Sequence, residues 1–189
     1  MPLLLASTSP QRRAILEQLG IPFEAVAPRY EEHEPPDADP IALVTEHAAG
    51  KARSVHRERG VTLGVDTTVH LGDRIYAKPR DEDDARTMLR ELAGRTHAVL
   101  SGLCLLAGER ETVGHAETLV TFRRLDEPAL ERYLASGEWE GRAGGYAIQG
   151  LGGRLVERID GDYLNVVGLP GALLLDVLET EAPQLLTGA

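Results

Sequence analysis

The sequence has a single cysteine and few aromatic residues, and the cysteine count already excludes one class of protein. Cys104 stands alone among 189 residues, so no disulfide can form within the chain. This fits a reducing cytoplasm, where we expect the protein to reside. The neighbours of Cys104 in LSGLCLLA are apolar, which favours a buried structural thiol over a reactive one.

Long hydrophobic runs are also missing. The apolar stretch LPGALLLDVL is interrupted by Asp176 and is too short to cross a bilayer. The apolar run that opens the chain is short, and no basic segment precedes it. We therefore expect neither a membrane span nor a signal peptide.

Positive charge is in the minority. The chain has 20 basic and 30 acidic residues, a net charge of −10, so we expect no nucleic acid or anionic membrane as a partner. Such a protein can still bind an anion where its basic residues are concentrated. The 42% of apolar residues indicates a globular chain, and its length suits one domain, with room for two lobes.

Apolar runs bounded by glycine and proline predict a mixture of strands and helices. We expect strands at 3–6, 22–28, 61–71, 74–77 and 154–159, a long hairpin over 96–122, and helices after Ser9, Asp39, Asp81, Asp126 and Pro170. The helix after Asp39 should reach about Arg59, and the segments 138–153 and 160–170 should be irregular. The fold class is therefore α/β with a mixed sheet.

The stretch LLLASTSPQRR places hydroxyls and two arginines where a strand enters a helix. Free N–H groups at a helix start, with Ser7, Arg12 and Arg13 beside them, would form a phosphate cradle. A helix cap with two solvated arginines explains the stretch equally well. Lys51 and Lys78 offer further cations, although a lone helical lysine such as Lys51 is usually exposed.

Asp66 interrupts the apolar strand LGVDTTV. A carboxylate there is costly unless it binds a metal ion, is paired or takes part in chemistry, and the alternative is a hydrogen-bonded aspartate at a strand end. Glu31 and Glu32 could add metal-binding oxygens, or could be ordinary acidic loop residues. The six histidines are scattered without HExxH or HxH, so we do not expect zinc. GxSxG and P-loop motifs are absent.

The motifs SxSPxRR, GVDTTV, AKPRD, GRTHAVLSG, GGYAIQGLG and GDYLNVVGLP occur in this order along nearly the whole chain. Together they resemble the Maf family of nucleoside triphosphate pyrophosphatases. The resemblance implies the Maf/Ham1 (ITPase-like) fold, an elongated mixed sheet with flanking helices and a cleft between two lobes. It also implies a single Maf-like domain over residues 1–189.

The family's activity is the hydrolysis of a nucleoside triphosphate to the monophosphate and pyrophosphate with a divalent cation, Mg²⁺ or Mn²⁺, as a house-cleaning function linked to restraint of cell division. The resemblance makes Asp66 the proton acceptor and, with Glu32, a metal ligand. It assigns phosphate contacts to Ser7, Arg12, Lys51 and Lys78, and base choice to Gln11, Thr67 and Gln149. The expected partner is the nucleotide, and the assembly is a monomer or a homodimer.

The three base-choice positions favour the branch that acts on dTTP and UTP. Thr67 and Gln149 match this branch, whereas Gln11 stands where the branch usually has arginine. None of the three matches the branch that acts on 7-methyl-GTP. The alternatives are a 7-methyl-GTP or broad-range pyrophosphatase, a nucleotide-binding regulator without catalysis, and a nucleotidyltransferase. A regulator would not need Asp66, and a transferase would need a second substrate motif.

Overall fold

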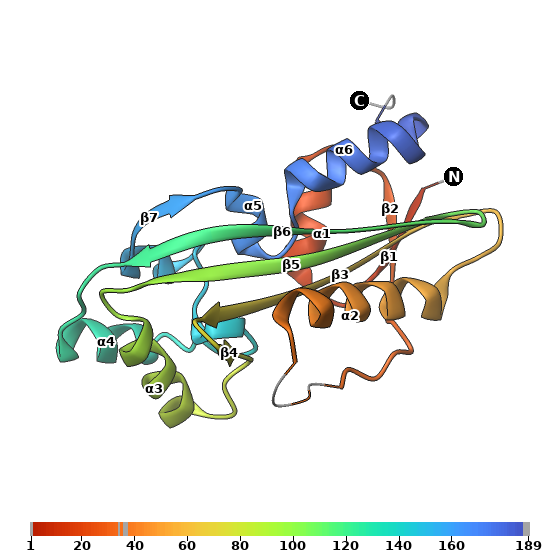
Figure 1. Cartoon of the computed structure of the whole chain (residues 1–189). Coiled ribbons are helices and arrows are strands. Elements are labelled where there is room, and N and C mark those ends of the chain that lie inside the picture. Colours follow the sequence, from red (N-terminus) through yellow and green to blue (C-terminus); the bar gives the residue numbers. More distant parts are fainter. Residues whose placement is uncertain (1, 34, 36–37, 187–189) are drawn as a thin grey trace. The chain divides into compact units, whose positions relative to one another are not determined.

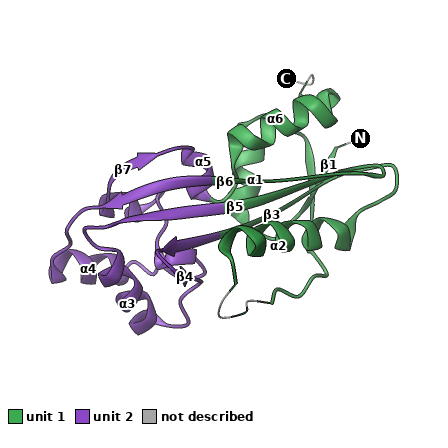
Figure 2. Cartoon of the chain, viewed as in Figure 1, with its two compact units in different colours: residues 1–67, 101–116, 168–189 green, residues 68–100, 117–167 purple. Residues whose placement is uncertain are grey.

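The computed structural model describes residues 2–33, 35 and 38–186. The chain divides into two compact units, shown in two colours in Figure 2. Unit 1 comprises residues 1–67, 101–116 and 168–189, and unit 2 comprises residues 68–100 and 117–167. The strands β3 (Val61–Leu71), β5 (Thr96–Ala107) and β6 (Arg110–Phe122) contribute residues to both units.

The described strands form a seven-stranded sheet in the order β2-β1-β3-β5-β6-β7, with β4 paired to β3. Strand β1 (Leu3–Ala6) runs parallel to β2 (Phe23–Val26) and to β3. Strands β4 (Arg74–Tyr76) and β7 (Val156–Asp160) are antiparallel to their neighbours. The mixed α/β class predicted from the sequence is confirmed.

In unit 1, helices cover both faces of the sheet (Figure 1). Helix α1 (Pro10–Gln18) connects β1 to β2, and α2 (Pro40–Val55) returns from β2 across β1 to β3. Right-handed crossovers in opposite directions place their helices on opposite faces. The last helix, α6 (Gly171–Glu181), packs on β6, where a Cβ atom added to Gly114 would lie 3.4 Å from side-chain atoms of Leu173.

Helix α2 approaches the sheet closely because two strands carry glycine beneath it. A Cβ atom on Gly64 of β3 would lie 2.1 Å from the carbonyl oxygen of Ala48. One on Gly102 of β5 would lie 2.1 Å from that of Val44. Ala48 and Ala52 are fully buried against the sheet. Since alternate residues of a strand share a face, Asp66 lies on the same face of β3 as Gly64, toward α2.

Unit 2 has its own apolar core under α3 (Glu82–Leu92) and α4 (Glu127–Leu134). Phe122, Tyr133 and Tyr146 are among its buried members. The unit also contains the 3₁₀ turns η1 (Ala143–Gly145) and η2 (Leu151–Leu155) and the short helix α5 (Tyr163–Val167). A final 3₁₀ turn, η3 (Pro183–Leu185), belongs to unit 1.

Most boundaries agree with the sequence analysis, and two expectations are wrong. The helix expected to reach Arg59 ends at Val55, because the ring of His56 turns away to bond Thr62 Oγ1 and the Gly108 carbonyl oxygen at 2.9 and 3.0 Å. The segment 160–170, expected to be irregular, contains α5.

The structure also bears on Cys104 and on the apolar helices. Cys104 is buried, as expected, and burial raises the pKa of its thiol to about 12. Among the described helices, none is both long enough and apolar enough to cross a bilayer.

Candidate active site

The turn from β1 into α1 holds the first group of site residues. Ser9 caps α1 by accepting a hydrogen bond from the Arg12 backbone N–H at 3.4 Å. Its own N–H donates to Ser7 Oγ at 3.1 Å, and its hydroxyl donates to Gln11 Oε1 at 3.0 Å. The cap predicted from the sequence is therefore present, and it fixes Ser7 and Gln11 beside the start of the helix.

Arg12 is not a solvated arginine. Its Nε donates to the Gly168 carbonyl oxygen at 2.9 Å, and its two terminal nitrogens donate to Ser7 Oγ and Thr67 Oγ1, each at 3.3 Å. Burial lowers the pKa of Arg12, while the charges of Asp66 and Glu32 act in the opposite direction. Arg13, by contrast, is exposed. The cap is therefore present, and only one of the two arginines is turned inward, while phosphate binding at this turn stays a prediction.

Helix α2 places Lys51 between two carboxylates. The Nζ atom lies 2.5 Å from Asp66 Oδ1 and 2.6 Å from Glu32 Oε1. Lys51 is only 6% exposed, so the alternative of a solvent-exposed lysine is wrong. A buried ammonium needs such compensation, because an unpaired charge in the interior is expensive.

His47 joins this cluster, although the sequence analysis did not single it out. It lies one turn before Lys51 on the same face of α2 and is 2% exposed. Its Nε2 is 3.2 Å from the His33 carbonyl oxygen, which can only accept a hydrogen bond. Nε2 therefore carries the proton in the neutral ring, and the lone pair is on Nδ1.

Nδ1 of His47 faces Asp66, and this contact raises the pKa of His47. Nδ1 is 3.4 Å from Asp66 Oδ2, yet within the described part of the chain it has no hydrogen-bond partner of good geometry. Ligand atoms of Glu32, His47 and Asp66 lie within 4.8 Å of one another. Two carboxylates and the Nδ1 atom of a neutral imidazole at this spacing suit a divalent cation. The sequence analysis could not identify His47 as part of this group, because the three residues come together only in the folded chain.

Asp66 is held in its ionised form. Burial alone would raise its pKa, but the interactions with His47 and Lys51, followed by the charge of Arg12, outweigh this effect. The pKa of Asp66 consequently lies well below the usual range for an aspartate. The strand-end alternative for Asp66 does not describe this environment, since the carboxylate is one of a cluster of charged groups.

Two residues assigned by the resemblance belong to unit 2. Lys78 and Gln149 are both exposed there, and their phosphate and base contacts stay predictions. In unit 1, Thr67 Oγ1 lies 2.9 Å from Ser101 Oγ and accepts from Arg12. The structure thus brings Ser7, Gln11, Arg12 and Thr67 together around α1, and Glu32, His47, Lys51 and Asp66 around α2.

Comparison with known proteins identifies the family. The model of the family described as "Maf-like protein" matches residues 2–181. A dTTP/UTP pyrophosphatase of Nitratidesulfovibrio vulgaris is 48% identical over 183 residues, covering 94% of this chain and 86% of the relative. Proteins with the same name from Gloeobacter violaceus and Aquifex aeolicus are 45% and 41% identical, each covering 94% of the relative and 93% or 94% of this chain. The chain therefore belongs to the Maf family.

Proposed function

We propose that this protein hydrolyses nucleoside triphosphates to the monophosphate and pyrophosphate, with dTTP and UTP as preferred substrates. The observation that carries the proposal is the charged cluster in which the buried Lys51 is shared by Asp66 and Glu32, beside the inward-facing guanidinium of Arg12. The names of the curated relatives support the same reaction and the same two nucleotides.

In the proposed reaction, Arg12 and Lys51 bind phosphate oxygens of the substrate, with Ser7 as a hydroxyl donor and Lys78 as a further cation. Cations in these positions stabilise the charge that builds on the departing pyrophosphate. The interactions with His47 and Lys51 hold Asp66 in its ionised form. As a carboxylate, Asp66 would orient and deprotonate the attacking water.

A triphosphate carries about four negative charges near neutral pH, so an acidic protein needs a divalent cation to accept it. Glu32, His47 and Asp66 would hold this ion, and they fit it, because Nδ1 of His47 is buried without a hydrogen-bond partner in the described structure. The bound ion would neutralise phosphate oxygens. Imidazole is a better ligand for Mn²⁺ than for Mg²⁺, so we propose Mn²⁺ as the preferred ion.

We assign base choice to Gln11, Thr67 and Gln149. An amide such as Gln149 can both donate to and accept from a uracil or thymine edge. Thr67 accepts a hydrogen bond from Arg12 and so connects a base-choice position to a phosphate-binding residue. We expect the enzyme to act on free nucleotides in the cytoplasm, as a monomer or a homodimer.

The proposal is tested by a panel of dTTP, UTP, CTP and 7-methyl-GTP with Mg²⁺ or Mn²⁺, in which pyrophosphate and orthophosphate are measured separately. We expect one pyrophosphate and one monophosphate per turnover, fastest with dTTP or UTP. Asp66→Asn should lower kcat by roughly 10²-fold or more, the usual contribution of a general base.

The matched control for this test is Asp73→Asn, which changes an exposed aspartate and should retain full activity. Release of orthophosphate with a nucleoside diphosphate would contradict the assigned bond. Binding of nucleotides without turnover would favour the regulator. Near-normal activity of Asp66→Asn would transfer the role of the base to another group, with Glu32 as the first candidate.

A further inference from the structure

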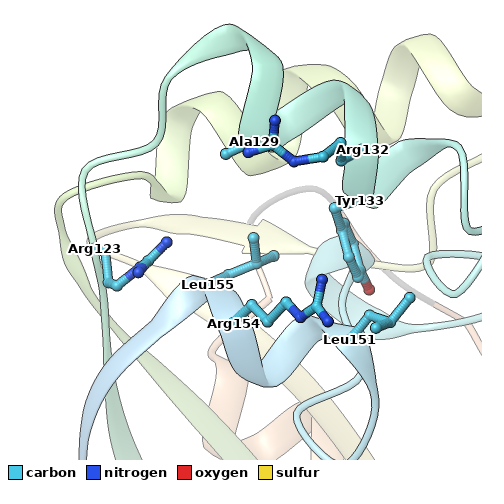
Figure 3. Close-up of a pocket in the computed structure, with 7 residues that line it drawn as sticks. All are labelled: Arg123, Ala129, Arg132, Tyr133, Leu151, Arg154 and Leu155. Carbon is cyan, nitrogen blue, oxygen red and sulfur yellow. The ribbon is translucent and has the colours of Figure 1, made fainter.

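Unit 2 contains a small pocket whose wall includes none of the residues assigned to the reaction. It is formed by Arg123, Ala129, Arg132, Tyr133, Leu151, Arg154 and Leu155. These residues come from the chain after β6, from α4 and from η2. Figure 3 shows three arginines entering from these separate segments around Leu155 and Tyr133. The cavity volume is about 120 Å³.

The arginines of this pocket differ from many others in the protein. Seven arginines form ion pairs with carboxylates: Arg53, Arg57, Arg74, Arg80, Arg86, Arg90 and Arg110. Across the described residues, no ion pair or side-chain hydrogen bond involves Arg123, Arg132 or Arg154. Some other arginines, such as Arg13, are also unpaired, but Arg123, Arg132 and Arg154 line one pocket together. An acidic chain therefore concentrates uncompensated positive charge at this place.

The positive region extends past the pocket. A shallower hollow shares Arg123, Ala129 and Arg132 with it and adds Arg124. The hollow also contains Asp126, but the Asp126 carboxylate accepts the Ala129 N–H at 2.8 Å as the cap of α4. This carboxylate is thus already engaged by the helix and pairs with none of the four arginines.

The frame of the pocket is fixed by backbone hydrogen bonds and burial. The Arg123 N–H donates to the Leu155 carbonyl oxygen, and the Gly94 N–H donates to the Arg123 carbonyl oxygen, both at 2.9 Å. Leu155 and Tyr133 are 2% and 4% exposed, and the Tyr133 hydroxyl accepts the Ala147 N–H at 3.1 Å. The arginines therefore stand on an ordered apolar floor, where charge interactions are stronger than in open water.

We propose that this pocket binds the phosphate group of a small anion, either inorganic phosphate or a phosphomonoester. Guanidinium groups match phosphate oxygens with paired donors, and arginines arriving from several directions suit a tetrahedral ion. The volume of about 120 Å³ is well below the roughly 300 Å³ of typical drug-sized ligand sites and suits a group as small as phosphate.

Calorimetric titration with inorganic phosphate, at constant ionic strength set with sodium chloride, tests the proposal. Arg132→Gln combined with Arg154→Gln should weaken one phosphate-binding event by about tenfold or more, because charge-assisted hydrogen bonds are lost. Arg158→Gln is the matched control, since Arg158 is an exposed arginine on β7 outside the pocket, and it should bind as the unchanged protein does.

A further variant separates this pocket from the candidate active site, which also contains cations. Arg12→Gln should leave the pocket's binding event in place, whatever the outcome for the proposed hydrolysis. Arg132→Lys combined with Arg154→Lys keeps the charge and loses the paired donors, so it should bind phosphate more weakly than the unchanged protein. Thermal unfolding of each variant verifies the fold.

Titration with glycerol 1-phosphate distinguishes the two sources of the phosphate group. Tighter binding of the ester than of inorganic phosphate would identify a phosphorylated metabolite, and the reverse would identify the free ion. The proposal is overturned if the double glutamine variant binds phosphate as tightly as the control. It is also overturned if chloride displaces phosphate in simple proportion to its concentration.

Discussion

At the scale of single residues, the site depends on sharing Lys51. Its ammonium lies between Asp66 and Glu32, at 2.5 and 2.6 Å. A divalent cation and Lys51 compete for the same oxygens, so substrate binding should release the lysine toward the phosphates. The released ammonium would then bind a phosphate oxygen, while the cation takes its place beside Asp66 and Glu32.

The histidine in this cluster gives a prediction that does not depend on turnover. His47→Leu removes Nδ1 while keeping an apolar side chain on α2, and we expect the affinity for Mn²⁺ to fall on the order of tenfold or more. The affinity for Mg²⁺ should change less, since Mg²⁺ prefers oxygen. Electron spin-echo spectroscopy of bound Mn²⁺ should show the coupling to a ring nitrogen in the unchanged protein and lose it in the variant.

The control for the histidine prediction is His115→Gln, which alters an exposed histidine on β6. It should leave both the Mn²⁺ affinity and the nitrogen signal unchanged. A nitrogen coupling that survives in His47→Leu would mean that another histidine, or a nitrogen of the solvent or buffer, binds the ion.

Base choice gives the second prediction at this scale. Gln149→Glu replaces amide donors by an acceptor-only carboxylate, so a base carbonyl that accepted from the amide would face negative charge. We expect kcat/KM for dTTP to fall roughly ten- to a hundredfold, since an unpaired polar contact costs about 1–3 kcal/mol. Gln11→Arg should sharpen the preference for dTTP and UTP. The test compares kcat/KM ratios between nucleotides, and an equal loss for all of them would exclude a base contact by Gln149.

Individual residues also show which parts of the site could be predicted from the sequence. Asp66 stands out in the sequence because a charge inside an apolar strand requires a partner, and the structure provides Lys51 and His47. His47 itself could not be identified, because it becomes a neighbour of Asp66 only through the packing of α2 on β3. A lone lysine on a helix is usually exposed, but Lys51 is buried because two carboxylates compensate its charge.

At the scale of elements, caps were the most reliable signals. Ser9, Asp39, Asp81 and Asp126 each accept a backbone N–H at the start of the expected helix. Their side chains act locally, so the sequence alone is sufficient. The predicted end of α2 was wrong because His56 bonds to Thr62 and to Gly108, and Gly108 lies far along the chain. The helix α5 was missed because only five residues form it, too few for a recognisable period.

The close packing of α2 gives a prediction for the element as a whole. In Gly64→Ala, the new methyl group would lie 2.1 Å from the Ala48 carbonyl oxygen, so helix and strand must move apart. We expect the free energy of unfolding to fall by about 3 kcal/mol, at the upper end of the cost of overpacking. Because α2 presents His47 and Lys51 to Asp66, the Mn²⁺ affinity should fall as well. Urea unfolding and metal titration measure the two effects.

Gly114→Ala is the control for this prediction. Gly114 is also a strand glycine of unit 1, but an added Cβ would meet only side-chain atoms of Leu173, at 3.4 Å. Its effect should stay within about 0.5 kcal/mol, as for substitutions away from tight contacts. A Gly64→Ala protein as stable as this control would show that the sheet and α2 can separate without cost.

At the scale of the whole molecule, the chain enters and leaves each unit several times. Unit 1 is assembled from three segments and unit 2 from two. Local sequence signals predicted the long hairpin that joins them, because its turn has a glycine and a polar pair at 108–110. They could not predict which part of each strand belongs to which core, since that depends on contacts between distant segments.

The stability of the molecule toward acid should depend on a buried histidine in the core of unit 2. His97 is 1% exposed and contacts the rings of Phe122 and Tyr146. Burial lowers the pKa of His97 to about 4, with a smaller contribution from His70. In the unfolded chain a histidine titrates near about 6.5, so the unfolded state binds more protons between these two values.

The sign of the pH effect follows from this difference. The stabilisation is fully present above about pH 6.5 and is lost as the pH falls toward about 4, with a total of roughly 3 kcal/mol. Between about pH 7 and about pH 5, His97 should account for a decrease of about 2 kcal/mol in the free energy of unfolding. His97→Phe should remove this part of the pH dependence, whereas His115→Gln, at an exposed position, should retain it. Urea unfolding at the two pH values is compared for the unchanged protein and the two variants.

The carboxylates of the three proteins contribute equally to the pH dependence, so only the difference between the two variants reports on His97. An equal pH dependence in His97→Phe and His115→Gln would mean that the buried ring accepts its proton as readily in the folded protein as in the unfolded chain.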